Sequence, residues 1–138
     1  MIMKVKVLIA ILLLLSVITS CKRNQEIEIG YLIKSSANSR WKIDIEHLHA
    51  RAKELNVKFV MRDAQGDENL QLKQAGELLD LGVDVLVVVA ANQNTAGGIV
   101  RAAHEKGVKV ISYDRLIKNA DLDYLISFEY EKIGELMV

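Results

Sequence analysis

The sequence has no proline, one cysteine and few aromatic residues among its 138 positions. A single cysteine cannot form a disulfide within the chain, so a small fold held together by disulfides is excluded. No sign of charge dominates either, because 18 basic residues stand against 18 acidic ones. Proteins that recruit nucleic acid through a basic face carry an excess of positive charge, so we expect no nucleic-acid partner.

Motifs of nucleotide-binding proteins and of enzymes are also missing. The sequence contains neither G-x-G-x-x-G nor G-x-x-x-x-G-K, and no serine or cysteine stands in a nucleophile elbow. His47 and His49 point to different sides of one predicted helix and His104 belongs to another, so we expect all three at the surface rather than around a metal. These absences predict a protein without enzyme chemistry and without a cofactor.

The first twenty residues have the composition of a targeting segment. Lys4 and Lys6 precede an apolar run over 7–18. This run is shorter than the roughly 20 apolar residues of a membrane span, and a charged start before an apolar centre is typical of a secretory signal. We therefore expect residues 1–20 to be a signal peptide that is removed on export.

The end of this segment, Ile-Thr-Ser-Cys at 18–21, resembles a bacterial lipobox, in which the cysteine becomes the lipidated first residue. We expect residues 1–20 to be a lipoprotein signal peptide and Cys21 to carry a lipid anchor, with 21–26 as a linker. The mature protein is then expected in the periplasm or cell envelope, tethered to a membrane. The alternative is an ordinary cleavage site beside a chance thiol.

Beyond the linker, short apolar segments alternate with segments of helical periodicity. The apolar segments, which predict strands, are 27–33, 57–61, 83–89, 108–113 and 124–128. The third is a nearly unbroken run of Val and Leu, which is typical of a parallel strand covered on both faces. The alternation predicts an α/β fold with a parallel sheet of order 2-1-3-4-5 and helices on both faces.

The helical segments show apolar residues at steps of three and four, the spacing of one helix face. The buried stripes that this spacing predicts are Trp41, Ile45, Leu48, Ala52 and Leu55; Leu72, Ala75 and Leu79; and Ala96, Ile99, Val100 and Ala103. Asp67 is the expected N-cap of the second helix, which ends before Gly82, and Gly107 is expected to close the third. A further helix is expected to begin at 133.

Polar residues follow three of the predicted strands, where ligands bind in open α/β sheets. Asp114 and Arg115 follow the fourth strand, Arg40 and Trp41 follow the first, and Asn92 follows the third. A carboxylate accepts from two neighbouring hydroxyls, a guanidinium donates in a fork, and an indole offers a flat apolar face. Together they predict a cleft for a hydroxyl-rich ligand such as a sugar.

Each of these residues also has a purely structural role that the sequence leaves open. Asp114 can accept from nearby backbone amides while Arg115 forms a surface ion pair. Trp41 can simply begin the buried stripe of the first helix. Asn92 can cap the helix that follows it, a role that its neighbours in the same loop can also fill.

Four segments carry a resemblance to a known family. They are S-R-W at 39–41, G-V-D-V-L-V at 82–87, V-I-S-Y-D-R at 110–115 and N-A-D-L-D-Y-L-I-S-F at 119–128. From Ile29 to its last residue the chain resembles the periplasmic sugar-binding proteins of ABC transporters, of the ribose and xylose type. The family usually has Asp-Asn where Glu129-Tyr130 stands here, and often has proline where Ala90 stands.

This resemblance implies that residues 27–138 form the N-terminal lobe of a sugar-binding domain, of the periplasmic binding protein type I fold, truncated before a second lobe. The residues that it implies as ligand-binding are Arg40, Trp41, Asn92, Asp114 and Arg115. A single lobe leaves a ligand open to water, so the chain by itself is expected to bind weakly.

The function that the resemblance implies is binding of a monosaccharide, D-xylose or a related pentose. The protein is then expected to deliver this ligand to the membrane subunits of an ABC importer. The alternative is a sugar-sensing input domain of a signal-transduction receptor, which uses the same fold.

Overall fold

The computed structural model describes residues 26–137, so the expected signal peptide and Cys21 lie outside the described residues. The elements are β1 (Glu28–Ile33), α2 (Ser39–Glu54), β2 (Lys58–Asp63), α3 (Glu68–Leu81), β3 (Val85–Val88), α4 (Gly97–Glu105), β4 (Lys109–Tyr113), β5 (Tyr124–Ile126) and α5 (Tyr130–Leu136). None of these helices is both long and apolar enough to cross a membrane.

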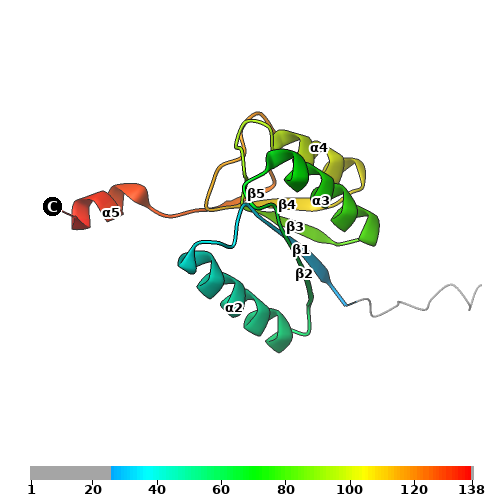
Figure 1. Ribbon diagram of the computed structural model, residues 1–138, viewed down its shortest axis with the longest axis horizontal. Helices are drawn as coiled ribbons and strands as arrows, with labels where there is room; N and C mark the ends of the chain where they lie inside the picture. The colour runs from blue at the N-terminus through cyan, green and yellow to red at the C-terminus, as the bar shows by residue number, and fades with distance from the viewer. Residues whose placement is uncertain (1–25, 138) are drawn as a thin grey trace, which may run out of the picture.

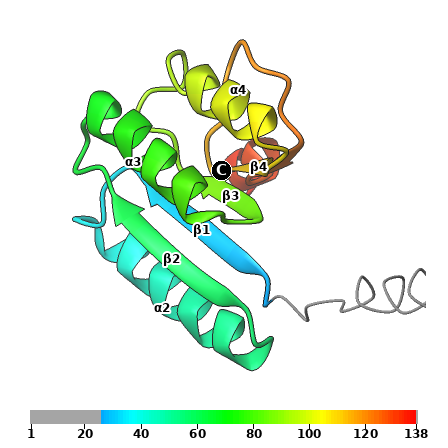
Figure 2. The ribbon, with the colours of Figure 1, turned by 90° about the vertical axis from the view of Figure 1, so that its right-hand side faces the viewer.

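The five strands form one parallel sheet of order β2-β1-β3-β4-β5, as the sequence predicted. Helix α2 lies against one face of this sheet, and α3 and α4 lie against the other (Figures 1 and 2). This arrangement follows from the right-handed crossovers of successive βαβ units. Because all five strands run the same way, their carboxyl ends meet at one edge of the sheet.

Two buried clusters hold the helices to the two faces. On β1, Leu32 belongs to the larger cluster with residues of α3 and α4, whereas Tyr31 and Ile33 belong to a smaller one that contacts α2. Successive side chains of a strand point to opposite faces, so a strand that is apolar at every position joins both clusters. The layered fold thus follows directly from the unbroken apolar runs of the central strands.

A glycine in β1 allows α3 to pack closely on the sheet. A Cβ atom at Gly30 would lie 2.8 Å from Leu86 Cδ2 and 3.1 Å from Leu78 Cδ1. Such distances are shorter than carbon atoms normally approach. The absence of a side chain at this position therefore sets the spacing between β1 and α3.

The expected helix ends are confirmed by their geometry. Asp67 caps α3 by accepting from the backbone amides of Asn69 and Leu70 at 2.8 and 3.1 Å. Gly82 has φ 84° at the C-cap of α3, and Gly107 has φ 72° just after α4. These are left-handed conformations that glycine adopts without steric cost.

Two positions of the expected buried stripes are wrong. Leu55 is exposed because α2 ends at Glu54, which makes Leu55 its C-cap. Leu72 is 48% exposed, whereas its neighbour Gln71 is 1% exposed. The face of α3 that packs on the sheet therefore begins at Gln71 rather than at Leu72. Gln71 can be buried although it is polar, because its side chain bonds to backbone groups at the exit of β3.

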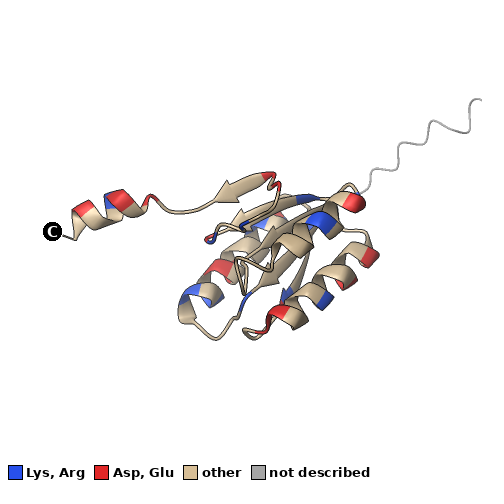
Figure 3. Cartoon of the chain, turned by 90° about the horizontal axis from the view of Figure 1, so that it is seen from above, with Lys and Arg blue, Asp and Glu red and all other residues tan. Residues whose placement is uncertain are grey.

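The boundaries of the last elements also differ from the expected ones. Strand β5 ends at Ile126, and α5 begins at Tyr130, three residues earlier than its apolar residues suggested. Strand β5 lies at the edge of the sheet and α5 extends away from its body (Figure 1). Figure 3 shows acidic and basic residues interspersed along the helices, with acidic residues prominent on α5.

His47 and His49 are exposed, as expected, whereas His104 is only partly exposed and pairs with Asp123. Its Nε2 atom lies 2.7 Å from Asp123 Oδ2, and its side chain is only one-third exposed. The same carboxylate accepts from Lys109 Nζ at 2.7 Å and from the backbone amide of Val110 at 2.9 Å. Asp123 therefore links the end of α4, the start of β4 and the loop before β5.

Asp123→Asn is expected to make stability less dependent on pH. The hydrogen bond from Lys109, followed by those from the Val110 amide and from His104, holds the pKa of Asp123 far below its usual range. A carboxyl whose pKa is lowered by folding stabilises the protein above its unfolded pKa of about 3.9 and loses this contribution as the pH falls.

The variant should therefore be less stable than the wild type by about 1–2 kcal/mol at pH 7, and the difference should shrink below about pH 4. Urea denaturation at a series of pH values measures this directly. Asp121→Asn, which changes an exposed carboxylate of the same loop, is the matched control. A stability difference that stays constant from pH 7 to pH 3 would contradict the role assigned to Asp123.

Candidate functional site

The structure brings Arg40 and Asp114 into direct contact at the carboxyl edge of the sheet. Arg40 Nη2 donates to Asp114 Oδ1 at 2.7 Å, and this bond joins the start of α2 to the exit of β4. The carboxylate is nearly enclosed, with 11% of its side chain exposed, whereas the arginine is 44% exposed. The Arg40 guanidinium is thus accessible to solvent, and the buried Asp114 carboxylate holds it from one side.

Arg40 is positioned by its place in the first turn of α2. Asn38 is the N-cap of this helix, and its Oδ1 atom accepts from the backbone amide of Arg40 at 2.9 Å. The guanidinium carbon lies 4.5 Å from the centre of the Trp41 ring and 4.8 Å from that of Phe128. The hydrogen bond to Asp114 raises the pKa of Arg40 above its usual value, so the side chain stays charged.

Asp114 has a left-handed backbone, with φ 67°. This conformation is uncommon for residues other than glycine, although Asp and Asn adopt it more readily than most. The backbone around it is held by β5 and its exit, because the Asp114 amide donates to Ile126 O at 2.8 Å and its carbonyl accepts from Ser127 Oγ at 3.1 Å. The tight turn aims the carboxylate at Arg40.

Arg115 follows in the same turn, which a buried serine secures. The hydroxyl of Ser112 donates to the carbonyl oxygen of Arg115 and accepts from the amide of Ile117 at 3.2 Å. The side chain of Ser112 is fully buried in β4. The segment after β4 is therefore a defined support for Arg115 rather than a loose loop.

Four of the five residues expected at the site line one hollow of about 350 Å³. Its lining residues are Lys34, Ser35, Ala37, Asn38, Arg40, Trp41, Asp114 and Arg115. Asn92 is not among them: it lines a neighbouring hollow of about 380 Å³, which also includes Glu68 and Arg115. Arg115 borders both hollows, so the two are adjacent.

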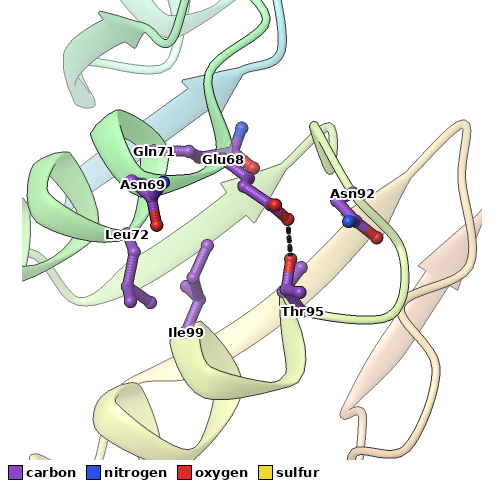
Figure 4. Close-up of a pocket in the computed structure, with 8 residues that line it drawn as sticks. Glu68, Asn69, Gln71, Leu72, Asn92, Thr95 and Ile99 are labelled. Carbon is purple, nitrogen blue, oxygen red and sulfur yellow. Dashed lines mark hydrogen bonds between the residues drawn. The ribbon is translucent and has the colours of Figure 1, made fainter.

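Asn92 does not cap α4, so that alternative role is wrong. The N-cap position of α4 is Ala96, without a capping side chain. Asn92 caps the turn that leads into α4 instead, because its Oδ1 accepts from the amide of Asn94 at 2.9 Å and its carbonyl accepts from that of Ala96 at 3.1 Å. The loop is also tied to α3 by Thr95, whose hydroxyl donates to Glu68 Oε2 at 2.5 Å (Figure 4). Figure 4 draws this contact among the residues that line a small pocket, Asn92 included. The volume of this pocket is about 100 Å³.

Gln71, which its sequence context did not single out, holds the loop that carries Asn92. Gln71 Nε2 donates to Val89 O at 3.0 Å, and Gln71 Oε1 accepts from the amide of Ala91 at 2.9 Å. These bonds satisfy two backbone groups at the exit of β3, which lies beside the first turn of α3. The available signal was its spacing, because Gln71 stands four residues before Ala75 and so lies on the same helix face.

Asp63, at the exit of β2, holds the loop between β1 and α2. Its carboxylate accepts from the amide and hydroxyl of Ser36 and from the amide of Gln65. Burial raises the pKa of Asp63, but the hydrogen bonds from Ser36 and Gln65 outweigh it, and the net pKa lies below its usual value. This loop includes Lys34 and Ser35, which line the 350 Å³ hollow.

Trp41 begins the buried stripe of α2 and also borders the hollow. It packs on the cluster that includes Tyr31 and Val89, and its ring lies edge-on to Tyr113, with 6.2 Å between the ring centres. Burial, followed by the hydrogen bond to Asp44, raises the pKa of Tyr113. One side of the indole is covered by the Arg40 guanidinium, so Trp41 contributes to the site mainly by supporting that group.

No metal centre stands out within residues 26–137, where no three side chains of His, Cys, Asp or Glu are grouped to hold an ion. What the site offers instead is hydrogen bonding. Guanidinium, ammonium and amide groups donate, and one enclosed carboxylate accepts. Such a set suits a neutral ligand with several hydroxyl groups.

A family model described as periplasmic binding protein domain matches residues 29–138. The chain is 34% identical to the D-xylose-binding periplasmic protein of Haemophilus influenzae over 135 residues, which cover 97% of this chain and 41% of that protein. It is 38% identical to the D-xylose-binding periplasmic protein of Escherichia coli over 112 residues, which cover 81% of this chain and 34% of that protein. The chain thus spans about two fifths or less of the length of these relatives.

Solved structures share the fold. An ABC transporter solute binding protein of Clostridium phytofermentans with bound β-D-glucose has a TM-score of 0.73 and 26% identity, over 78% of this chain and 33% of that one. A fructose binding periplasmic domain of a hybrid two component system has a TM-score of 0.70 and 28% identity, over 81% of this chain and 37% of that one.

Proposed function

The chain belongs to the periplasmic binding protein domain family, and from this premise we propose that it is the sugar-binding N-terminal lobe of an extracytoplasmic solute-binding protein. The observation that carries the proposal is the Arg40–Asp114 pair at the mouth of a polar hollow, beside Arg115. Relatives in this family are described as binding proteins, which agrees with the expectation of a protein without enzyme chemistry.

The proposed ligand is a monosaccharide, D-xylose or a related pentose. In this proposal the Asp114 carboxylate accepts from sugar hydroxyls, and the guanidinium groups of Arg40 and Arg115 donate to ring and hydroxyl oxygens. Asn92 contributes from the adjacent hollow, and Trp41 supports Arg40 and borders the ring. Two relatives described as D-xylose-binding, both above 30% identity, support the choice of pentose.

We further propose that residues 1–20 direct export, that Cys21 carries a lipid anchor, and that the protein acts in the periplasm or cell envelope. Residues 27–138 would then face a second lobe across the hollow, as the greater length of the relatives suggests. The proposed partners are the membrane subunits of an ABC importer. A structural neighbour described as an ABC transporter solute binding protein supports this assignment.

A sugar-sensing input domain is the second candidate function. It is favoured by the likeness to a fructose binding domain of a hybrid two component system. Deleting the gene separates the two functions. Transport predicts loss of uptake of labelled sugar, whereas sensing predicts intact uptake and loss of the transcriptional response to sugar.

Titration calorimetry tests the proposed function, with D-xylose, D-ribose, L-arabinose and D-glucose as ligands. It uses the full-length protein, by which we mean the proposed two-lobed protein that includes this lobe. We expect D-xylose to bind with a dissociation constant of about 1 μM or lower and the hexose to bind more weakly. A protein that binds none of the four sugars at millimolar concentration would overturn the proposal.

A further inference from the structure

Phe128 lies against the site although it follows β5, far along the chain from the first strand exit. Its ring centre lies 4.8 Å from the guanidinium carbon of Arg40, and the ring centre of Trp41 lies 4.5 Å from the same atom. Two aromatic rings from different elements thus contact one cationic group. Contacts of this length lie within the range of cation–π attraction.

The ion pair with Asp114 does not by itself orient Arg40. The single close contact is from Nη2 to Oδ1, and the arginine side chain is 44% exposed. Because the arginine side of the pair is open to solvent, the pair contributes modest free energy, and one contact leaves the guanidinium plane free to turn. A ligand that needs a fork of donors in a fixed direction requires a further constraint on this plane.

We propose that Phe128 is a positioning residue for Arg40 in the sugar site, a role that rests on the proposed function. Its ring and that of Trp41 hold the guanidinium so that the donors not engaged by Asp114 face the hollow. The effect is to reduce the rotational freedom that Arg40 would otherwise lose when a sugar binds. Phe128 thus acts through Arg40 and needs no contact with the ligand.

The surroundings of Phe128 agree with this role rather than with core packing. Its side chain is 46% exposed and belongs to neither buried cluster. Its described aromatic neighbour on the same segment is Tyr130, with ring centres 6.3 Å apart, and the hydroxyl of Tyr130 donates to the carbonyl of Asp114 at 3.4 Å. The segment after β5 therefore contacts both members of the ion pair.

The same segment also secures the backbone of Asp114. The Asp114 amide donates to Ile126 O, and its carbonyl accepts from Ser127 Oγ. Consequently, a shift of the residues after β5 would move the carboxylate and the ring that covers the guanidinium together. The residues after β5 therefore hold Arg40 and Asp114 in place relative to each other.

Replacing Phe128 in the full-length protein tests the proposal. Phe128→Leu should weaken binding of D-xylose about fivefold, because ordering one long side chain on binding costs about that factor. Phe128→Tyr keeps a ring over the guanidinium and should bind within about twofold of the wild type. Leu125→Ala removes an equally exposed apolar side chain from β5 and should leave the affinity unchanged. Titration calorimetry measures all four proteins.

A ligand-free measurement makes the test independent of sugar binding. Two rings facing the guanidinium should displace the Arg40 Nε–H resonance by ring currents, and Phe128→Leu should move it toward the position of solvent-exposed arginines. An Arg40→Lys variant assigns the signal. Wild-type affinity in Phe128→Leu, an unmoved resonance, or a failure of Phe128→Tyr to restore binding would each overturn the proposal.

The two measurements also distinguish failure of the positioning role of Phe128 from failure of the proposed sugar-binding function. If the wild type binds none of the sugars, the proposed function fails. The ligand-free resonance then still decides whether Phe128 holds Arg40. If the wild type binds D-xylose and Phe128→Leu binds it equally well, only the positioning role fails.

Discussion

Replacing Asp114 with asparagine is expected to lower the affinity for D-xylose by about one to two orders of magnitude. The substitution removes the enclosed carboxylate that accepts from Arg40 and, in our proposal, from the sugar. Hydrogen bonds to charged groups contribute about 1.5–3 kcal/mol each, which corresponds to this loss. The Arg40 guanidinium would also lose its ion-pair partner.

Asparagine is the appropriate replacement because of the backbone at this position. With φ 67°, Asp114 has a conformation that asparagine tolerates as well as aspartate, whereas alanine would be strained. Calorimetric titration gives the affinity, and thermal denaturation shows whether the fold is retained. Asp80→Asn, which alters a surface ion pair on α3, is the control. Unchanged affinity in Asp114→Asn would remove Asp114 from the site.

The second large effect is expected in Gln71→Leu, which should destabilise the protein by about 2–4 kcal/mol. Leucine keeps most of the volume but leaves the Val89 carbonyl and the Ala91 amide without the partners that Gln71 provides. Each buried polar group that loses its partner costs about 1–3 kcal/mol. Because Asn92 lies just beyond these groups, sugar affinity should fall as well.

Urea denaturation measures the stability of this variant, and titration with D-xylose measures its affinity. Lys73→Ala changes an exposed residue of the same helix and should alter neither quantity. A Gln71→Leu protein with wild-type stability would show that the β3 exit does not depend on this clamp. A stable variant with reduced affinity would instead show that the clamp serves the loop alone.

Local patterns were sufficient to predict the fold. Unbroken apolar runs, helical spacing and the glycines at 82 and 107 mark the strands and helix ends. The handedness of βαβ crossovers then leaves few strand orders, and the predicted order is confirmed. These predictions succeeded because each depends on residues close together in the sequence.

The supports of the site were not predictable in the same way. Gln71, Asp63 and Phe128 each act on residues that are distant in sequence, through hydrogen bonds or ring contacts. Periodicity indicates which face of a helix is apolar, but it does not indicate which distant residue a polar side chain will contact. The expected burial of Leu72 failed for this reason, since a polar neighbour took the inner position to satisfy backbone groups.

The sequence by itself determined the α/β architecture and the set of polar residues that leave the strands at one edge. Burial of apolar segments and the chirality of the chain specify these features locally. Only the tertiary structure decided which of those residues meet: Arg40 pairs with Asp114, while Asn92 lines a neighbouring hollow that shares Arg115. The reason is that side-chain partners depend on loop conformations, which are set by hydrogen bonds between segments far apart in the chain.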